Sequence, residues 1–143
     1  MIIDISWTEI ERDSRILAEW LQAGPPIKGL IAIARGGLIP AALLARELDV
    51  RMVETIAVAT YQGQQASRPR LIKPAAVSDE GEGWVFVDDL VDRGLTAKFV
   101  RNLLPRARFV CLYAKPEGRP FADYVVTEFP QDSWLRFAWE RPE

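Results

Sequence analysis

Short apolar segments alternate with segments of helical pattern along this chain, and that alternation constrains the fold more than any other feature. Gly29–Ala34 (GLIAIA) is apolar throughout and is closed by a pair of glycines, which is typical of a strand buried on both faces. Leu38–Leu48 follows with a helical pattern, in which Pro40 is tolerated because it falls in the first turn. Strands that alternate with helices in this way predict an α/β fold, with a parallel-sheet core flanked by helices.

The alternation extends in both directions from this unit. A helix is predicted after Ser6, because Ser6 and Glu9 have the spacing of a capping box, and it should end at residues 23–26 (AGPP). Its expected buried face holds Trp7, Ile10, Leu17 and Leu21, interrupted by Ser14. Further strands are predicted over residues 50–61, residues 84–87 and Arg108–Ala114, and a further helix over residues 97–104.

Two segments do not follow the alternation. Residues 62–75 (QGQQASRPRLIKPA) are polar and long for a connection, so we expect a flexible lid loop there. Residues 115–143 contain several prolines together with Trp134 and Trp139, so we expect a small irregular hood rather than another strand–helix unit. The 143 residues are most simply one domain, 1–143.

The composition excludes several function classes. With 18 Lys and Arg against 20 Asp and Glu, the net charge is −2, which argues against nucleic acid as a partner. The chain has no histidine, which excludes Ser-His and Cys-His catalysis and, with a single cysteine, argues against zinc. Cys111 lies in an apolar run, as expected of a buried thiol in a reducing compartment, so we expect a cytoplasmic location. No signal-like N-terminal segment or membrane-length apolar run occurs, so we expect at most peripheral contact with the inner membrane.

The first candidate for ligand binding is the sequence Ala-Arg-Gly-Gly at the end of the strand Gly29–Ala34. In open α/β sheets, ligands bind beyond the carboxyl ends of the strands. Gly36 and Gly37 let the backbone approach a ligand closely, the helix that follows presents free amides, and Arg35 can donate to a phosphate. Because an Arg-Gly-Gly turn is more often only a turn, this motif alone leaves the phosphate role open.

The second candidate is the acidic stretch VFVDDLVDRGLTA, over residues 85–97. Asp88 and Asp89 are expected at the end of a strand, where their hard oxygen ligands suit Mg²⁺. Asp92 follows, and Gly94 and Thr96 precede a helix, a turn whose amides can form a nest for a phosphate. A single aspartate at a strand end usually caps a helix or is solvated. Three so close together repel one another unless a cation or hydroxyl donors are present, which indicates a site.

These motifs resemble those of the type I phosphoribosyltransferase family, and within it the xanthine-guanine phosphoribosyltransferases of bacteria. The resemblance covers most of the chain. It rests on IAIARGGLIPAALLARELDVR (31–51), EGWVFVDDLVD (82–92), FVCLYAKPEGRPFADYVV (109–126) and PQDSW (130–134).

The resemblance implies the type I phosphoribosyltransferase fold and a Mg²⁺-dependent activity in purine salvage. The family transfers ribose 5-phosphate from phosphoribosyl diphosphate to N9 of a 6-oxopurine, here xanthine or guanine, giving XMP or GMP and diphosphate. It also implies a homo-oligomer, a tetramer or a dimer. Two alternatives stay open: a phosphoribosyltransferase acting on hypoxanthine or another base, and a nucleotide-binding regulator of the same fold without turnover.

The resemblance also implies roles for individual residues on the diphosphate side. Arg35, with Gly36 and Gly37, matches the loop that holds the diphosphate, and Arg68 matches an arginine of the lid. Catalytic roles fall on three aspartates: Asp89 matches the carboxylate facing the metal, Asp88 its neighbour near the ribose hydroxyls, and Asp92 a carboxylate near purine N7.

On the phosphate and purine side, the resemblance places the 5′-phosphate in the loop Asp92, Arg93, Gly94, Leu95 and Thr96. Lys115 matches the donor to the 6-oxo group, although a lysine after a strand can also be a plain surface residue. Trp134 and Leu135 match the segment that covers the base, with a core position as the alternative for Trp134.

The phosphate loop departs from the family pattern Thr-Gly-Gly-Thr. Leu95 replaces a glycine, which would cost roughly 1 kcal/mol or more if this position needed a positive φ. Arg93 replaces a hydroxyl donor, and its side chain can point either to the phosphate or to solvent.

Overall fold

The computed structural model describes residues 1–60 and 68–141. Its main sheet has six strands in the order β4-β3-β2-β5-β6-β7, and neighbouring strands run parallel except for the antiparallel pair β3 and β4. The strands are β2 (Gly29–Ala34), β3 (Val53–Ala59), β4 (Arg70–Lys73), β5 (Trp84–Val91), β6 (Arg108–Ala114) and β7 (Tyr124–Glu128). The expected α/β fold with a mostly parallel sheet is confirmed.

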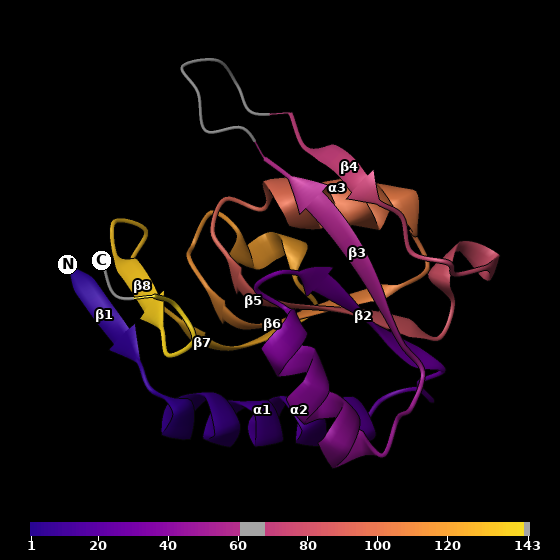
Figure 1. The fold of residues 1–143 in the computed structure, drawn as a ribbon, viewed down its shortest axis with the longest axis horizontal. Helices are drawn as coiled ribbons and strands as arrows, with labels where there is room; N and C mark the ends of the chain where they lie inside the picture. The colour runs from indigo at the N-terminus through magenta and orange to yellow at the C-terminus, as the bar shows by residue number, and fades with distance from the viewer. Residues whose placement is uncertain (61–67, 142–143) are drawn as a thin grey trace.

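The helices lie on both faces of this sheet. Helices α1 (Trp7–Gln22) and α2 (Leu38–Leu48) cover one face, and α3 (Leu95–Leu103) lies on the other (Figure 1). Two short 3₁₀ turns, η1 (Asp79–Gly81) and η2 (Arg119–Phe121), lie in the connections. Within residues 1–60 and 68–141, no helix has the length and apolar character needed to cross a bilayer.

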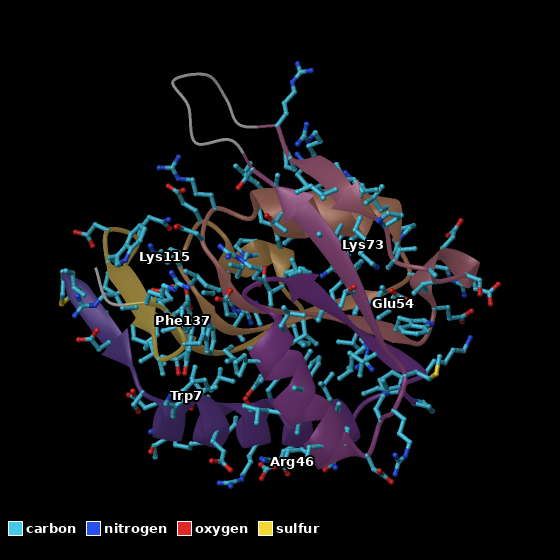
Figure 2. The ribbon with its side chains drawn as sticks, viewed as in Figure 1. Trp7, Arg46, Glu54, Lys73, Lys115 and Phe137 are labelled. Carbon is cyan, nitrogen blue, oxygen red and sulfur yellow. The ribbon has the colours of Figure 1, made fainter. Side chains whose placement is uncertain are left out.

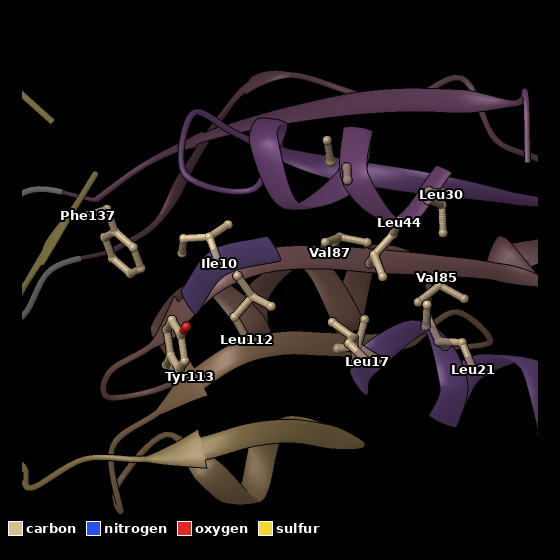
Figure 3. Close-up of a cluster of buried hydrophobic side chains, with 14 of the residues drawn as sticks. Ile10, Leu17, Leu21, Leu30, Leu44, Val85, Val87, Leu112, Tyr113 and Phe137 are labelled. Atoms are coloured by element: carbon tan, nitrogen blue, oxygen red, sulfur yellow. The ribbon is translucent and has the colours of Figure 1, made fainter. Parts of the chain in front are cut away.

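Successive residues of the central strands point to opposite faces, so each face has its own core. On one face, Val85 and Val87 of β5 pack with Leu17 of α1 and Leu44 of α2 (Figure 3). On the other face, Phe86 of β5 belongs to a second cluster that includes residues of α3. Because β2, β5 and β6 are covered on both sides, they form a rigid platform for the loops that follow them.

Helix α1 begins at the predicted capping box. The Glu9 amide donates to the Ser6 hydroxyl at 3.2 Å, and the Ser6 amide donates to the Glu9 carboxylate at 2.8 Å. The predicted buried face is confirmed for Ile10, Leu17 and Leu21, together with Ser14. The prediction for Trp7 was wrong: the residue is 52% exposed, because it is the first residue of α1 and its ring lies against Trp139, 6.0 Å between ring centroids, rather than in the core.

A buried polar pair lies under α1. The Tyr113 hydroxyl of β6 donates to Asp13 Oδ2 at 2.5 Å, and Arg12 Nε lies 3.0 Å from the other carboxylate oxygen of Asp13. Asp13 is 2% exposed and Tyr113 is 1% exposed. Burial, with the hydrogen bond to Asp13, raises the pKa of the Tyr113 hydroxyl well above its ordinary value.

Replacing Tyr113 by phenylalanine is expected to lower the free energy of unfolding by about 1–3 kcal/mol near neutral pH, because Asp13 loses its buried donor. The unfolded wild-type chain releases the Tyr113 proton near pH ~10, whereas the folded chain retains it, so wild-type stability falls above that pH. The Tyr113→Phe variant lacks this loss. Urea unfolding of both proteins between about pH 8 and 11 should therefore show a difference that shrinks as pH rises. A pH-independent difference would contradict this assignment.

Several element boundaries differ from the expected ones. The strand expected over residues 50–61 is the shorter β3, which follows a left-handed residue, Asp49. β5 continues to Val91 because β6 pairs with it through the register Asp88↔Cys111 and Val91↔Ala114. Asp88 and Asp89 therefore lie within the strand rather than at its end. The helix expected from residue 97 begins earlier, at Leu95.

The two segments outside the alternation are more regular than expected. In the expected lid loop, residues 70–73 form the edge strand β4, while residues 62–67 lie outside the described residues. In the expected irregular hood, β7 joins the main sheet beside β6. Only β8 (Trp134–Phe137) lies apart from that sheet, where it pairs in parallel with β1 (Ile2–Ile5), a strand that the sequence pattern did not predict (Figure 1).

Candidate active site

Loops from the carboxyl ends of three central strands meet at one edge of the sheet. After β2, an added Cβ at Gly36 would lie 2.5 Å from the Asp89 carboxylate of β5. After β6, the Lys115 amide donates to the Val91 carbonyl of β5 at 3.0 Å. Figure 2 shows Lys115 on the side of the sheet where β8 lies. The two motifs that the sequence singled out therefore lie side by side.

The Arg35-Gly36-Gly37 loop lies directly against β5. The peptide bond between Ala34 and Arg35 is cis, and the Gly37 amide donates to the Ile33 carbonyl at 2.8 Å. Gly37 has φ −82°, which any residue adopts, but an added Cβ would lie 2.1 Å from the Val87 carbonyl oxygen. The glycines are thus required by the close approach of the loop to β5. Arg35 itself is exposed.

Replacing Gly37 by alanine is expected to destabilise the protein by about 1–3 kcal/mol, because a backbone carbonyl cannot move away as a flexible side chain can. The matched control is Gly24→Ala, where the nearest atom to the added Cβ is the mobile end of Arg108, at 3.0 Å. Thermal unfolding of the two variants should show a lower midpoint for Gly37→Ala than for Gly24→Ala. Equal midpoints would contradict the close contact between the loop and β5.

Asp88 and Asp89 form a half-buried acidic pair in β5. Asp88 Oδ1 accepts a hydrogen bond from the Asp89 amide at 2.9 Å, and Asp89 Oδ1 accepts one from the Leu90 amide at 2.7 Å. Burial and the neighbouring Asp89 charge raise the pKa of Asp88 well above its usual range. Burial also raises the pKa of Asp89. Two carboxylates held in this way favour a cation beside them.

The acidic pair supplies carboxylate oxygens of the kind that Mg²⁺ prefers as ligands. Within the described residues, no three His, Cys, Asp or Glu side chains gather into a metal cage. Mg²⁺ is commonly held by one or two carboxylates together with substrate phosphates and water. The donor set of Asp88 and Asp89 agrees with that pattern.

The loop after β5 starts α3 without a side-chain cap. Gly94 is left-handed, with φ 87°, and an added Cβ would lie 2.2 Å from the Phe121 ring. Leu95 is the first residue of α3 and is not among the residues with positive φ, so the strain considered for a leucine at this position does not arise. Because glycine offers no side chain to the first-turn amides, these amides are free to bind an anion.

Arg93 turns toward the loop that follows β6. Its Nε lies 3.8 Å from the carboxylate of Glu117, and the two side chains are 76% and 59% exposed. Exposed pairs of this length contribute little to stability. The pair therefore leaves Arg93 able to reorient toward an anion at the start of α3.

Lys115 is buried rather than a surface residue. It is only 5% exposed, and its Nζ lies 3.3 Å from Asp92 Oδ2. The other carboxylate oxygen of Asp92 accepts a hydrogen bond from Gln131 Nε2 at 2.7 Å. Sequence reasoning missed Gln131, because a neutral amide distant in the chain carries no charge pattern that would link it to Asp92.

Trp134, Leu135 and Arg68, which the sequence also predicted as site residues, differ in their exposure. Trp134 is 64% exposed, so a core position for it is excluded. Leu135 is 5% exposed and packs in the core, which leaves its backbone as the part able to meet a ligand. Arg68 is exposed and adjoins the residues outside the described ranges.

Comparison with known proteins shows the family to which this chain is similar. The phosphoribosyl transferase domain family matches residues 6–142. The xanthine-guanine phosphoribosyltransferase of Gluconobacter oxydans is 50% identical over 139 residues, covering 95% of this chain and 83% of the relative. That of Chromohalobacter salexigens is 48% identical over 136 residues, covering 95% and 82%. The crystal structure of a purine phosphoribosyltransferase from Pyrococcus horikoshii superposes with a TM-score of 0.84 at 29% identity, covering 99% of this chain and 95% of that one. The chain therefore belongs to the phosphoribosyl transferase family, and its relatives include bacterial xanthine-guanine phosphoribosyltransferases.

Proposed function

We propose that this chain is a purine salvage enzyme that transfers the 5-phosphoribosyl group from phosphoribosyl diphosphate to N9 of xanthine or guanine. The products are XMP or GMP and diphosphate. The observation that carries the proposal is that the acidic pair, the uncapped start of α3 and the Lys115–Asp92 contact meet at one edge of the sheet. The similarity to xanthine-guanine phosphoribosyltransferases over 95% of the chain supports the choice of base.

The phosphate groups of the substrate divide between two loops. Arg35, Gly36 and Arg68 bind the diphosphate, and Gly37 allows the loop to approach β5. The backbone amides of the loop Asp92, Arg93, Gly94, Leu95 and Thr96, with the side chains of Arg93 and Thr96, bind the 5′-phosphate at the start of α3, a position that favours anions.

Asp89, with Asp88 beside it, is the residue expected to hold Mg²⁺. When bound, Mg²⁺ supplies positive charge that stabilises the departing diphosphate. Arg35 adds to that stabilisation, because the bond to the anomeric carbon breaks as charge develops on both sides of it. Asp88 accepts hydrogen bonds from the ribose hydroxyls.

Asp92 and Lys115 act on the purine. Asp92 accepts the proton that the purine gives up as N9 forms its bond to the ribose, and Lys115 donates to the 6-oxo group. Lys115 Nζ lies 3.3 Å from Asp92 Oδ2, so the donor to the 6-oxo group and the acceptor of the purine proton are adjacent. Trp134 covers the base, and the Leu135 backbone reads it.

We also propose that the protein is one domain, that it acts in the cytoplasm and that it forms a homotetramer or dimer. The free, buried Cys111 supports a reducing compartment. The exposed apolar side chains of Met1 and Ile2 at the start of the chain would suit contact with another subunit. Sedimentation velocity at two protein concentrations tests the oligomeric state.

A panel of bases tests the proposed activity. The protein is incubated with phosphoribosyl diphosphate and Mg²⁺, together with xanthine, guanine or hypoxanthine, and diphosphate release is followed. Release with xanthine and guanine is the expected result. Release with hypoxanthine alone would favour a different acceptor, and no release with any base would favour a nucleotide-binding regulator without turnover.

A further inference from the structure

We propose that Gln131 is a positioning residue for Asp92, which it holds in the orientation that takes up the purine proton. This inference rests on the proposed function. Gln131 lies in the turn before β8, whereas Asp92 follows β5, so the contact between them joins the purine-covering segment to the reacting carboxylate.

The amide of Gln131 has a single orientation that satisfies both of its neighbours. Its Oε1 accepts a hydrogen bond from the Glu117 amide at 2.9 Å, and a backbone N–H can only donate. Its Nε2 therefore faces Asp92, and donates to Oδ1 at 2.7 Å. Rotating the side-chain amide by half a turn would place two donors together at Glu117 and two acceptors together at Asp92.

The two oxygens of Asp92 consequently have different environments. Oδ1 is held by the neutral amide of Gln131 at 2.7 Å, whereas Oδ2 faces the Lys115 ammonium at 3.3 Å. The side chain of Asp92 is 52% exposed, so packing alone does not fix its rotamer. The hydrogen bond from Gln131 supplies that restraint and keeps Oδ2 directed toward Lys115, the proposed donor to the purine.

The turn that carries Gln131 is itself fixed. The Ser133 amide and hydroxyl both donate to the Pro130 carbonyl, at 3.0 and 2.6 Å, and Ser133 is 3% exposed. On the other side, Gly118 packs so closely on β5 that an added Cβ would lie 2.7 Å from the Asp92 carbonyl. Gln131 thus joins its own turn to the loop of Glu117 and to Asp92, and the contacts of Ser133 and of Gly118 hold these segments in place.

Two variants separate positioning from a structural role. Gln131→Glu keeps the acceptor for the Glu117 amide but replaces the donor to Asp92 by a negative charge. Gln131→Leu removes both hydrogen bonds and leaves an apolar side chain of similar length in their place. The matched control is Gln22→Glu, the same chemical change at an exposed position of α1 away from the site. The charged groups near Asp92 are Lys115, the Arg93–Glu117 pair and the Asp88–Asp89 pair, and all of them stay unchanged in these variants.

For each protein, kcat and KM for phosphoribosyl diphosphate are measured with guanine across a range of pH, together with the thermal unfolding midpoint. Both Gln131 variants should lower kcat by about 10- to 100-fold, as orienting partners of reactive groups do, while KM changes by less than about threefold. In Gln131→Glu the acidic limb of kcat/KM should move to higher pH, because a neighbouring carboxylate makes Asp92 harder to ionise. Gln22→Glu should match the wild type.

If the wild type is active and both Gln131 variants keep its kcat and the acidic limb of its kcat/KM profile, the positioning role is overturned. A lower unfolding midpoint with kcat and KM changed in parallel and an unmoved pH profile would also overturn it, since that pattern indicates a structural role. An inactive wild type with every base would overturn the proposed function, and this assignment with it.

Discussion

Replacing Asp92 by asparagine is expected to lower kcat by about 10²–10⁴-fold, the range that a general base contributes. Asparagine keeps one acceptor for Gln131, but its amide nitrogen would then face the Lys115 ammonium, and it cannot take up a proton. Binding of phosphoribosyl diphosphate should be retained, because the Asp92 side chain contacts Lys115 and Gln131 and the backbone amides of the 5′-phosphate loop are unchanged. Single-turnover kinetics with guanine measure the chemical step, and calorimetry measures substrate binding.

The control for this substitution is Asp132→Asn, which removes a charge from an exposed residue in the neighbouring turn. It should leave kcat within about twofold of the wild type, as surface changes outside a site usually do. Unchanged turnover in Asp92→Asn would remove Asp92 from the mechanism. A parallel loss of substrate binding would show that Asp92 supports the phosphate loop instead.

Replacing Asp89 by asparagine is expected to lower kcat/KM for phosphoribosyl diphosphate by about 10²–10³-fold, since the leaving group loses the charge stabilisation that a held Mg²⁺ supplies. The Mg²⁺ concentration that gives half-maximal rate should rise at the same time, because a neutral amide oxygen is a weaker ligand than a carboxylate. Initial rates over a Mg²⁺ titration measure both effects.

Asp49→Asn is the matched control for the Asp89 substitution. Asp49 ends α2 in a left-handed conformation, with φ 52°, which asparagine also adopts readily. Its Mg²⁺ titration should follow that of the wild type. An Asp89→Asn variant with the same half-maximal Mg²⁺ concentration as the wild type would assign the metal to other ligands.

The elements with strong local patterns could be predicted from the sequence. β2, α2 and β6 have the predicted bounds, because each is a continuous apolar or helical run between clear turn residues. The capping box at Ser6 is equally local. β2 and β6 place the Arg35 loop and Lys115 on either side of β5, which carries the acidic pair. The outline of the site therefore follows from sequence and topology together.

Other features depend on contacts between distant parts of the chain. β1 and β8 are four-residue strands that exist because Ile2 pairs with Trp134, and neither has a pattern of its own long enough to predict it. β5 extends through two aspartates because β6 supplies hydrogen-bonding partners, although local propensity favours a loop there. The Gln131–Asp92 contact is of the same kind.

The phosphate loop shows how a local departure can be absorbed by its surroundings. The residue of the loop that needs a positive φ is Gly94, which the chain retains, so Leu95 enters α3 without strain. Arg93 rests against Glu117 in an exposed ion pair that costs little to break. The substitutions relative to the family pattern are therefore compatible with phosphate binding.

Identification of the product is the most direct test of this account. The wild-type protein is incubated with phosphoribosyl diphosphate and either xanthine or guanine, with Mg²⁺ or with excess chelator, and the nucleotide is identified by mass and by co-elution with authentic XMP and GMP. We expect XMP and GMP, each with an equivalent of diphosphate, only when Mg²⁺ is present, and a strongly reduced yield with Asp92→Asn. If the wild-type protein binds phosphoribosyl diphosphate but forms neither XMP nor GMP in the presence of Mg²⁺, the account is contradicted.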